Sequence, residues 1–367
     1  MREKNMRILD KYIIKEMLGT FIFGIFAFSS VFIGSSTLFR IAQYVTNYGA
    51  SIQAVIKLFI YSLPSIVVLT FPMSMLLATL LSFGRLSASS EITAMKSGGI
   101  SFYRIAMPVF IIALVVSVFA ILFNEHVVPR ANEGYSYVVN FEIKGNTAPK
   151  SQDHVVLKEI KEGQINRLTY ARRYDAQTMA MYGVSIQEFE NDTLVRVQNA
   201  EKADWSNDHW TMHNGILYDL SAEGNVQRTL KFSQQILPIS QSPNEIIRSQ
   251  KKPDEMTMRE LRHQIKAMQM QSVDTNELEV ELYKRITIPF ATFIFALIGT
   301  PLGLQPNRTS SSIGFGISII IIFVYYTIMT ISSTLAQGGS VNPLVAAWMP
   351  NTIGLIVGIS LMRKAAK

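Results

Sequence analysis

The sequence contains no cysteine, which excludes disulfide bonds, thiol nucleophiles and cysteine-ligated metals. Charged residues are also scarce, at 17% of 367 residues, whereas soluble domains carry roughly 25%. The shortage is uneven, because long uncharged runs fill the first and last thirds and nearly all acidic residues lie between them. This distribution excludes a single soluble globule, a disordered chain and a fibrous repeat. It predicts an integral membrane protein with one polar domain inserted.

Several sequence motifs of known chemistry are also missing. No GxxxxGK[ST] or GxGxxG motif occurs, so the chain does not bind ATP by the phosphate-loop route. His209 and His213 form an HxxxH without a glutamate base, and on a strand they would lie about 13 Å apart, too far for one zinc ion. We therefore expect no catalytic residues, no metal site and no cofactor in this chain.

Six apolar stretches are long enough to cross a bilayer, which takes about 20 residues in a helix. They are residues 17–39, 56–83, 105–123, 286–304, 313–335 and 343–362. The second stretch contains Pro64 and Pro72 and is expected to be kinked or broken. None of the six has an Asp, Glu, Lys, Arg or His residue near its middle. Ion-coupled transporters usually place such residues there, so energy for transport would have to come from another subunit.

The lysines and arginines of the short loops predict the orientation. With the N-terminus in the cytoplasm, twelve of them lie inside and only Arg40 and Lys57 lie outside. Both termini are then cytoplasmic, and the insert between the third and fourth spans is outside. The net charge of +7 is typical of loops facing anionic lipid, so we expect no nucleic-acid partner.

Between residues 154 and 237 the sequence alternates in short runs that are separated by turn signals. This pattern predicts an antiparallel β-sandwich, jelly roll or meander. Thr257 and Glu260 then form a capping-box pattern at the start of a helical segment. A second helical segment, 276–285, is expected to continue into the fourth span.

The loop after the second span reads GRLSASSEITAMKSGGIS, residues 84–101. It predicts a short helix over about 87–98 that Ser87 or Ser89 would cap and Gly98 and Gly99 would end. Ala88, Ile92 and Met95 would share one apolar face. Two interpretations remain open on these grounds: the helix docks into a cytoplasmic partner, or it lies on the lipid headgroups.

This loop, together with YIIKEML, NEHVVPRAN and ELYKRITIPF…GTPLGLQPNR, resembles the permease subunits of the lipopolysaccharide export ABC transporter. The resemblance covers essentially the whole chain. It implies transmembrane helices 1–3 and a cytoplasmic coupling helix in 1–124, a periplasmic β-jellyroll-like domain with linking helices in 125–285, and transmembrane helices 4–6 in 286–367. The fold class is thus an α-helical membrane protein of the bacterial inner membrane, with three plus three spans flanking an inserted all-β domain.

The resemblance also implies partners and site residues. The expected partners are a cytoplasmic ATPase dimer that binds ATP and magnesium, a paralogous six-span permease, a periplasmic bridge protein with a β-jellyroll domain, and lipopolysaccharide. Glu91, Ile92 and Met95 would contact the ATPase, and Arg40 and Arg130 would contact lipid phosphate. Arginine suits that contact because its guanidinium pairs bidentately with phosphate. For each arginine the alternative is a structural role, for Arg40 as a headgroup anchor.

Two further points stay open in the sequence. GxxxG spacings at Gly299–Gly303 and Gly354–Gly358 permit close helix packing, either within the chain or against the paralogue. A mechanotransmitting permease of the lipoprotein-release class is an alternative to the lipopolysaccharide permease. It is disfavoured because such permeases usually have four spans with the large domain after the first. A membrane-anchored binding or enzymatic domain would not need six spans.

Overall fold

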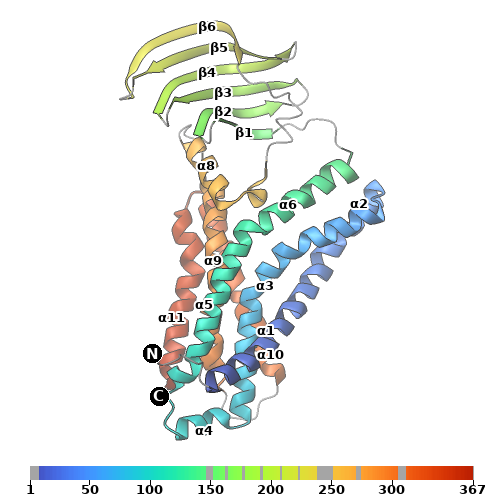
Figure 1. Ribbon diagram of the computed structural model, residues 1–367, viewed down its shortest axis with the longest axis vertical. Helices are drawn as coiled ribbons and strands as arrows, with labels where there is room; N and C mark the ends of the chain where they lie inside the picture. Colours follow the sequence, from blue (N-terminus) through green and yellow to red (C-terminus); the bar gives the residue numbers. More distant parts are fainter. Residues whose placement is uncertain are drawn as a thin grey trace. The chain divides into compact units, whose positions relative to one another are not determined.

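The structure is a computed structural model that describes residues 8–145, 152–161, 164–175, 178–190, 193–206, 209–221, 224–237, 251–269, 274–304 and 311–366. The chain forms two compact units (Figure 1). The membrane unit comprises residues 1–143, 253–261 and 274–367. The sheet unit comprises residues 144–252 and 262–273. It is narrower than the predicted 125–285 domain, because the helices that flank it pack on the membrane helices.

Among the residues that the structure describes, six helices or helical runs are long and apolar enough to cross a membrane, as predicted. Each extends beyond the apolar stretch that identified it, because polar residues continue the helix into the flanking segments. The bounds are α1 Ile8–Phe32, η1 Ile33–Thr37 and α2 Leu38–Tyr48 for the first run, then α3 Ile52–Ala88, then α5 Phe102–His126 with α6 Val128–Tyr137 and η2 Val138–Ile143, then α9 Asn276–Leu302, α10 Ser311–Gln337 and α11 Pro343–Ala366.

Prolines lie inside these helices without ending them. Of the kink or break expected in the second span, the structure excludes the break, since α3 is one helix that includes Pro64 and Pro72. In α9, Pro289 has no N–H for the carbonyl of Arg285 four residues earlier. Asn124 of α5 donates its Nδ2 to that carbonyl at 3.4 Å. Ser117 of α5 also donates to the carbonyl of Pro289 at 2.9 Å. Helix α5 therefore supplies polar partners to α9 at the proline itself and four residues before it.

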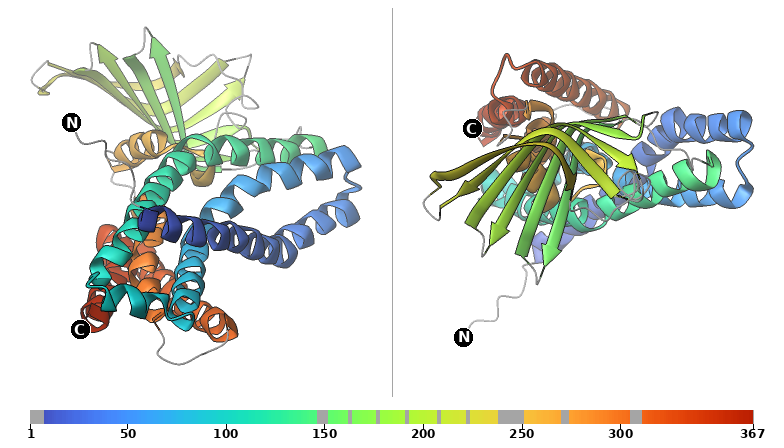
Figure 2. Two further views of the ribbon diagram at one scale, coloured as in Figure 1. Left: turned by 60° about the horizontal axis from the view of Figure 1, so that its bottom comes forward. Right: turned by 90° about the horizontal axis from the view of Figure 1, so that it is seen from above.

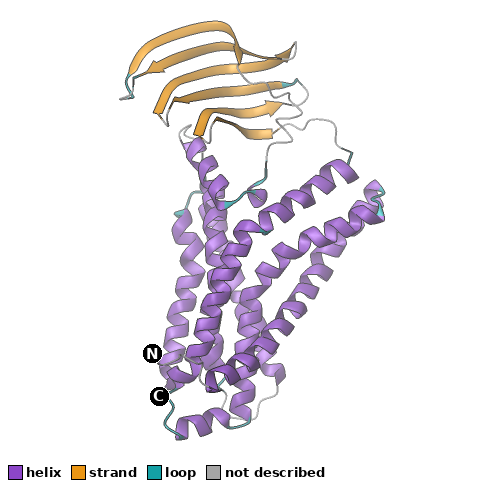
Figure 3. Cartoon of the chain, viewed as in Figure 1, coloured by secondary structure: helices purple, strands orange, loops and turns teal. Residues whose placement is uncertain are grey.

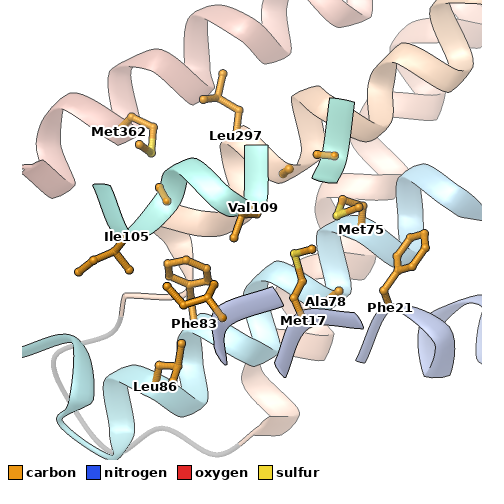
Figure 4. Close-up of a cluster of buried hydrophobic side chains, with 14 of the residues drawn as sticks. Met17, Phe21, Met75, Ala78, Phe83, Leu86, Ile105, Val109, Leu297 and Met362 are labelled. Atoms are coloured by element: carbon orange, nitrogen blue, oxygen red, sulfur yellow. The ribbon is translucent and has the colours of Figure 1, made fainter. Parts of the chain in front are cut away.

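The core of the membrane unit is an apolar cluster to which α1, α3, α4, α5, α9 and α11 contribute (Figure 4). Met17, Met75 and Ile105 are fully buried there. The GxxxG spacings pack within the chain. A Cβ on Gly299 would overlap the hydroxyl of Thr79 in α3, and one on Gly354 would lie 2.5 Å from a methyl of Ile294 in α9. Close helix contacts at glycine therefore join α9 to α3 and to α11.

The sheet unit contains a single six-stranded antiparallel sheet (Figures 2 and 3). Its strands are β1 Gln152–Lys161, β2 Gln164–Asp175, β3 Ala180–Glu190, β4 Thr193–Ser206, β5 His209–Leu220 and β6 Val226–Leu237. They pair in the order in which they occur in the chain. The described strands therefore form a meander, one of the three predicted alternatives. The predicted all-β domain inserted between the third and fourth spans is thus confirmed, with its strands paired in sequential order.

A crease crosses this sheet from β1 to β5. His154, Gly183 and Asn214 have positive φ values of 56°, 61° and 50° on alternate strands. These positions have no pairing partner in the registers of the described strands, although the residues on either side of them are paired. Val184 and Met181 are three residues apart and would face opposite sides of a regular strand, yet both are buried in the same apolar cluster. The strands thus exchange their buried face at the crease, and one sheet encloses its own core.

Beyond the crease, a row of alternating charges crosses five strands. Glu159 pairs with Arg167 at 2.7 Å, and Arg167 pairs with Glu188 at 3.1 Å. Glu188 also pairs with Arg196 at 3.3 Å, and Arg196 pairs with Asp219 at 2.7 Å. The hydrogen bond to Asp219 raises the pKa of Arg196 above its ordinary value. Because opposite charges face each other at each step, the row favours the observed register.

Tyr174 is the most deeply placed titratable group of the sheet. Its side chain is fully buried, and its hydroxyl has no hydrogen-bond partner among the described residues. Burial raises the pKa of this phenol above its ordinary value, and the charge of Asp175 adds to the rise. Its ring lies 6.3 Å from that of Trp210 in an edge-on arrangement.

The predicted capping box is confirmed. The backbone N–H of Thr257 donates to Glu260 Oε2 at 2.8 Å, and the N–H of Glu260 donates to Thr257 Oγ1 at 3.2 Å. These two bonds satisfy amides that would otherwise be free at the start of α8, Met258–Gln269. The second predicted helical segment is confirmed as well, since α9 runs unbroken from Asn276 into the fourth span.

Candidate functional site

A short helix, α4 Glu91–Ser97, lies in the loop between α3 and α5 (Figure 1). It ends as predicted, with Gly98 at its C-cap and Gly99 in the left-handed conformation at φ 83°. The N–H of Ile100 bonds to the carbonyl of Met95 at 3.0 Å, and that of Gly99 bonds to the carbonyl of Lys96 at 3.0 Å. These two bonds define a Schellman motif, which satisfies the last carbonyls of the helix.

The start of α4 differs from the prediction. Ser87 lies inside α3 and Ser89 is the C-cap of that helix, whereas the N-cap of α4 is Ser90 at φ 60°, which makes no side-chain cap. Ser89 instead donates its hydroxyl to Glu91 Oε1 at 2.8 Å. The capping prediction was wrong because α3 continues further than the apolar stretch indicated.

Glu91 is half-buried and is held from two sides. Its Oε2 accepts a hydrogen bond from the hydroxyl of Tyr12 in α1 at 2.8 Å, in addition to the bond from Ser89. The carboxylate therefore connects α4 to the first turns of α1. Because a carboxylate has about four acceptor positions, it can still bind a cation of another molecule.

The structure places Ile92 and Met95 away from the exposed surface of α4. Ile92 is 3% exposed and belongs to the same core cluster as Phe83 and Phe102. Met95 packs against that cluster and is half-buried. Ile92 is thus covered by the helices of this chain, whereas Met95 keeps part of its surface exposed, and the contact of these residues with another protein stays a prediction. The exposed face of α4 carries Thr93, Ala94, Lys96 and Ser97.

Two ion pairs next to Glu91 were not predicted from the sequence. Asp10 of α1 pairs with Arg104 of α5 at 2.6 Å, and Glu16 of α1 pairs with Arg85 of α3. With Tyr12, these residues form an N-terminal clamp that joins the first turns of α1 to α3, α4 and α5. The partners are far apart in sequence, so no local spacing indicates them. Lys96 also donates to the carbonyl of Ala365 in α11 at 3.4 Å.

The two arginines predicted to contact lipid phosphate are both exposed. Arg40 is not at the end of its helix, since α2 continues to Tyr48. Its neighbour Ile41 is buried against the start of α3. Arg130, in α6, donates Nη1 to the carbonyl of His126 at 3.1 Å. Arg40 lies on α2 and Arg130 on α6, and their contact with lipid phosphate stays a prediction.

The HxxxH pair falls on β5. His213 Nε2 lies 3.0 Å from Asp204 Oδ2, and Lys202 Nζ lies 2.6 Å from the other oxygen of that carboxylate. The bond to Asp204 raises the pKa of Lys202 above its ordinary value. His213 of β5 thus contacts a carboxylate of the neighbouring strand β4, on which both Lys202 and Asp204 lie.

Six apolar helical runs, with an antiparallel sheet inserted between the third and the fourth, define a multi-pass helical membrane protein with an inserted β domain. Residues 11–364 match the family described as lipopolysaccharide export system permease LptF/LptG. The chain belongs to this family and is a permease of the inner membrane. The lipoprotein-release alternative is not favoured.

Individual relatives match over nearly their whole length. The lipopolysaccharide export system permease protein LptG of Haemophilus influenzae is 21% identical over 367 residues, covering 95% of this chain and 96% of the relative. LptG of Escherichia coli K12 is 22% identical over 375 residues, covering 98% and 99%. LptF of the same strain is 22% identical over 382 residues, covering 96% and 94%. The similar identities do not separate the two kinds of permease.

Proposed function

We propose that this chain is the transmembrane subunit of an ATP-driven transporter that extracts lipopolysaccharide from the inner membrane and passes it to a periplasmic bridge toward the outer membrane. Family membership over residues 11–364 carries this proposal. The spans support it, because they lack Asp, Glu, Lys, Arg and His residues near their middle and so suit an apolar or amphipathic cargo. The chain supplies neither catalytic residues nor a cofactor. A separate cytoplasmic ATPase dimer binds ATP and magnesium.

The other partners follow from the same membership. The relatives include both LptG and LptF proteins, which supports a paralogous six-span permease as the second half of the transport path. The inserted sheet supports a periplasmic bridge protein with a similar β domain as the next acceptor of the cargo. We propose that Arg40 and Arg130 contact lipid phosphate, because both are exposed cations of the membrane unit.

Both termini lie in the cytoplasm in this proposal. The start of α1, helix α4 and the end of α11 lie at one end of the membrane unit, since Tyr12 bonds to Glu91 and Lys96 bonds to Ala365. This is also the end at which the lysines and arginines of the short loops collect, as cytoplasmic segments do.

The coupling helix is α4, and Glu91 is its contact with a basic residue of the ATPase. Ile92 and Met95 lie beside this contact, and they also fix α4 to the core of its own chain. When the ATPase halves close and move α4, the displacement passes to α3 and α5 through this core and to α1 through Tyr12. Movement of these helices narrows the cavity between the two permeases and expels the lipid.

Two substitutions test this role from the two sides of one hydrogen bond. Glu91→Lys reverses the docking charge and also loses the bond to Tyr12, whereas Tyr12→Phe loses the same bond and keeps the charge. Each tagged variant is purified with its partners, and the retained ATPase and the lipopolysaccharide released per ATP are measured. We expect the amount of ATPase that copurifies to fall at least tenfold in Glu91→Lys relative to the parent chain, and to stay unchanged in Tyr12→Phe.

Retention of the ATPase by Glu91→Lys would refute the docking role of Glu91. Loss from both variants would assign the effect to the bond between α1 and α4 instead. Copurification of the parent chain with a different lipid, and with no lipopolysaccharide, would refute the assignment of lipopolysaccharide as the cargo.

A further inference from the structure

Residues 253–258 belong to the membrane unit and form a short segment, here called the strap, that a buried cation holds. The strap begins with the 3-10 turn η3, Pro253–Glu255. Arg285 of α9 donates Nη2 to the carbonyl of Pro253 at 2.5 Å and Nη1 to that of Met256. A buried guanidinium is costly unless its donors are satisfied, and Arg285 is 6% exposed. Because both acceptors are main-chain atoms, these bonds fix the path of the strap on α9, whatever side chains it carries.

Helix α5 holds the other end of the strap. Glu125 Oε2 accepts a hydrogen bond from the N–H of Met258, the first residue of α8, at 2.8 Å. A carboxylate at a helix N-terminus is also stabilised by the helix dipole. Since side chains of α5 bond to the backbone of α9 near Pro289 as well, these two helices and the strap form one support.

Helix α6 is bound to the strap by two side chains. Asn132 donates Nδ2 to the carbonyl of Asp254 at 2.8 Å, and Ser136 donates to Glu255 Oε1 at 2.5 Å. Glu255 is 6% exposed, and a carboxylate buried to this extent requires a hydrogen-bond donor. The direction of α6 depends on such contacts, because Val127 separates this helix from α5 and provides no side-chain cap.

Helix α6 is part of an arm of the membrane unit (Figures 1 and 2). The arm consists of α2, the start of α3 and the α6–η2 run, which share one apolar cluster, and comprises residues 38–48, 52–61 and 128–143. A Cβ on Gly134 of α6 would lie 2.9 Å from the ring of Tyr61 in α3, so the two helices pack closely. The strap therefore holds the whole arm when it holds α6.

Both arginines proposed to contact lipid phosphate lie on this arm. Arg130 lies on α6 itself, two residues before Asn132. Arg40 lies on α2, and its charge acts on the phenol of Tyr135, the residue before Ser136. The two positions at which the strap binds α6 are thus close in sequence to the residues that carry or face the cations. Release of α6 from the strap would change the position of both arginines.

We infer that Arg285 is a positioning residue for lipid binding: through the strap it holds α6 and the arm, so that Arg40 and Arg130 meet the phosphates of lipopolysaccharide. The inference rests on the proposed function, because it assumes that these two arginines bind lipid phosphate. Arg285 does not bind the lipid itself, since two of its donors bind the strap and its side chain is buried. Its substitution should therefore lower the preference for phosphorylated lipid, whereas a purely structural loss would weaken the retention of lipid with and without phosphate alike.

The test uses the complex of this chain with its ATPase and paralogous permease, reconstituted without ATP. The vesicles contain equal amounts of lipopolysaccharide and of enzymatically dephosphorylated lipopolysaccharide. The complex is then purified in mild detergent, and the two lipid forms that it retains are quantified by mass spectrometry. The ratio of the phosphorylated to the dephosphorylated form, here called the phosphate preference, is the readout.

Two variants release the arm, and each has a matched control. Arg285→Gln removes the charge and one or more of the bonds to the strap, and Arg259→Gln removes the same charge from an exposed position of α8. Asn132→Ala frees α6 from the strap and also loses a bond of 2.7 Å from the hydroxyl of Ser65 in α3. Ser65→Ala loses only the second of these bonds and is the control for Asn132→Ala.

We expect the parent complex to prefer the phosphorylated form by about tenfold or more, because two arginines supply charge-assisted hydrogen bonds. A chain with both Arg40→Gln and Arg130→Gln should lose this preference. Arg285→Gln should lower it by about threefold or more, and Arg259→Gln should leave it unchanged. Asn132→Ala should lower the preference relative to its own control, and it decides alone if Arg285→Gln does not fold.

A phosphate preference equal to that of the controls in the folded variants would overturn the inference, even if both lipid forms were retained less well. An effect of Arg285→Gln on the preference in the chain without Arg40 and Arg130 would also overturn it, because the effect would then not pass through these cations. Failure of the proposed function gives a different result: the parent complex retains neither lipid form, or the chain without the two arginines keeps the preference. Either result overturns the inference together with the proposed contact.

Discussion

The contact between α3 and α9 predicts a large effect of one methyl group. An alanine at position 299 would place its Cβ on the hydroxyl of Thr79 and 3.2 Å from the carbonyl oxygen of Leu76. Thr79 cannot simply turn away, because it is fully buried and its other γ position is a methyl group. Its hydroxyl also donates to the carbonyls of Met75 and Leu76 at 2.9 Å. The two helices must therefore move apart to accept Gly299→Ala.

The expected magnitude combines two opposing terms. Overpacking of a buried contact costs about 3 kcal/mol when neither neighbour can yield. Replacing a helical glycine by alanine returns about 1 kcal/mol through helix propensity. Gly299→Ala should thus lose about 2 kcal/mol of the free energy of unfolding. Gly19→Ala is the control, because nothing lies within 4 Å of its added Cβ and it should be neutral or gain up to about 1 kcal/mol.

The assay is titration of the purified full-length chain in mild micelles with sodium dodecyl sulfate, followed by circular dichroism at a helical wavelength. A second substitution, Thr79→Ala, removes the hydroxyl that the new methyl group would meet. The double variant should recover about 1–2 kcal/mol relative to the sum of the single changes. A Gly299→Ala chain as stable as the parent would refute the close contact, and an absence of recovery would refute Thr79 as its cause.

Two further predictions concern the sheet, and both are read from tryptophan fluorescence in a Trp348→Phe background, which leaves Trp205 and Trp210 as reporters. Above about pH 10 an unfolded tyrosine loses its proton while buried Tyr174, with its raised pKa, keeps it, so the stability of the sheet falls as the pH rises. Tyr174→Phe should reduce this fall and cost at most about 1 kcal/mol of stability at neutral pH. An alkaline transition that the substitution leaves unchanged would contradict the assignment to Tyr174. Glu188→Gln breaks the row of alternating charges at its centre and should lose about 1–2 kcal/mol in urea unfolding, discounted for partial exposure. The exposed Glu190→Gln should lose almost nothing, so equal losses would show that the row adds no stability.

The sequence predicts best those features that depend on residues close together in the chain. Each span is a run of about 20 apolar residues, a signal that needs no tertiary information. The Thr257 capping box and the Gly98–Gly99 helix end are equally local, and the structure confirms both. Alternation of polar and apolar residues likewise predicted antiparallel strands. It could not choose between meander and jelly roll, because strand order depends on contacts between distant segments.

The candidate site was predicted less completely for the same reason. The pattern of α4 shows an apolar face but does not show what covers it, so Ile92 was taken for a contact with another protein although its own chain buries it. The bond from Tyr12 to Glu91 joins residues 79 positions apart. The contacts of Arg285 with the turn at 253–256 were missed likewise, because a buried arginine close to a span has no local signature.

The proline in α9 has a consequence for how the membrane unit can deform. The side chains of Asn124 and Ser117 in α5 donate hydrogen bonds to the main-chain carbonyls of Arg285 and Pro289 in α9. Sliding these two helices past each other would leave the carbonyl of Arg285 without its partner from α5, and a carbonyl left unpaired away from water costs several kcal/mol by order of magnitude. Helices α5 and α9 therefore move as one rigid body, and any rearrangement of the bundle must take place at the contacts that this pair makes with the other helices.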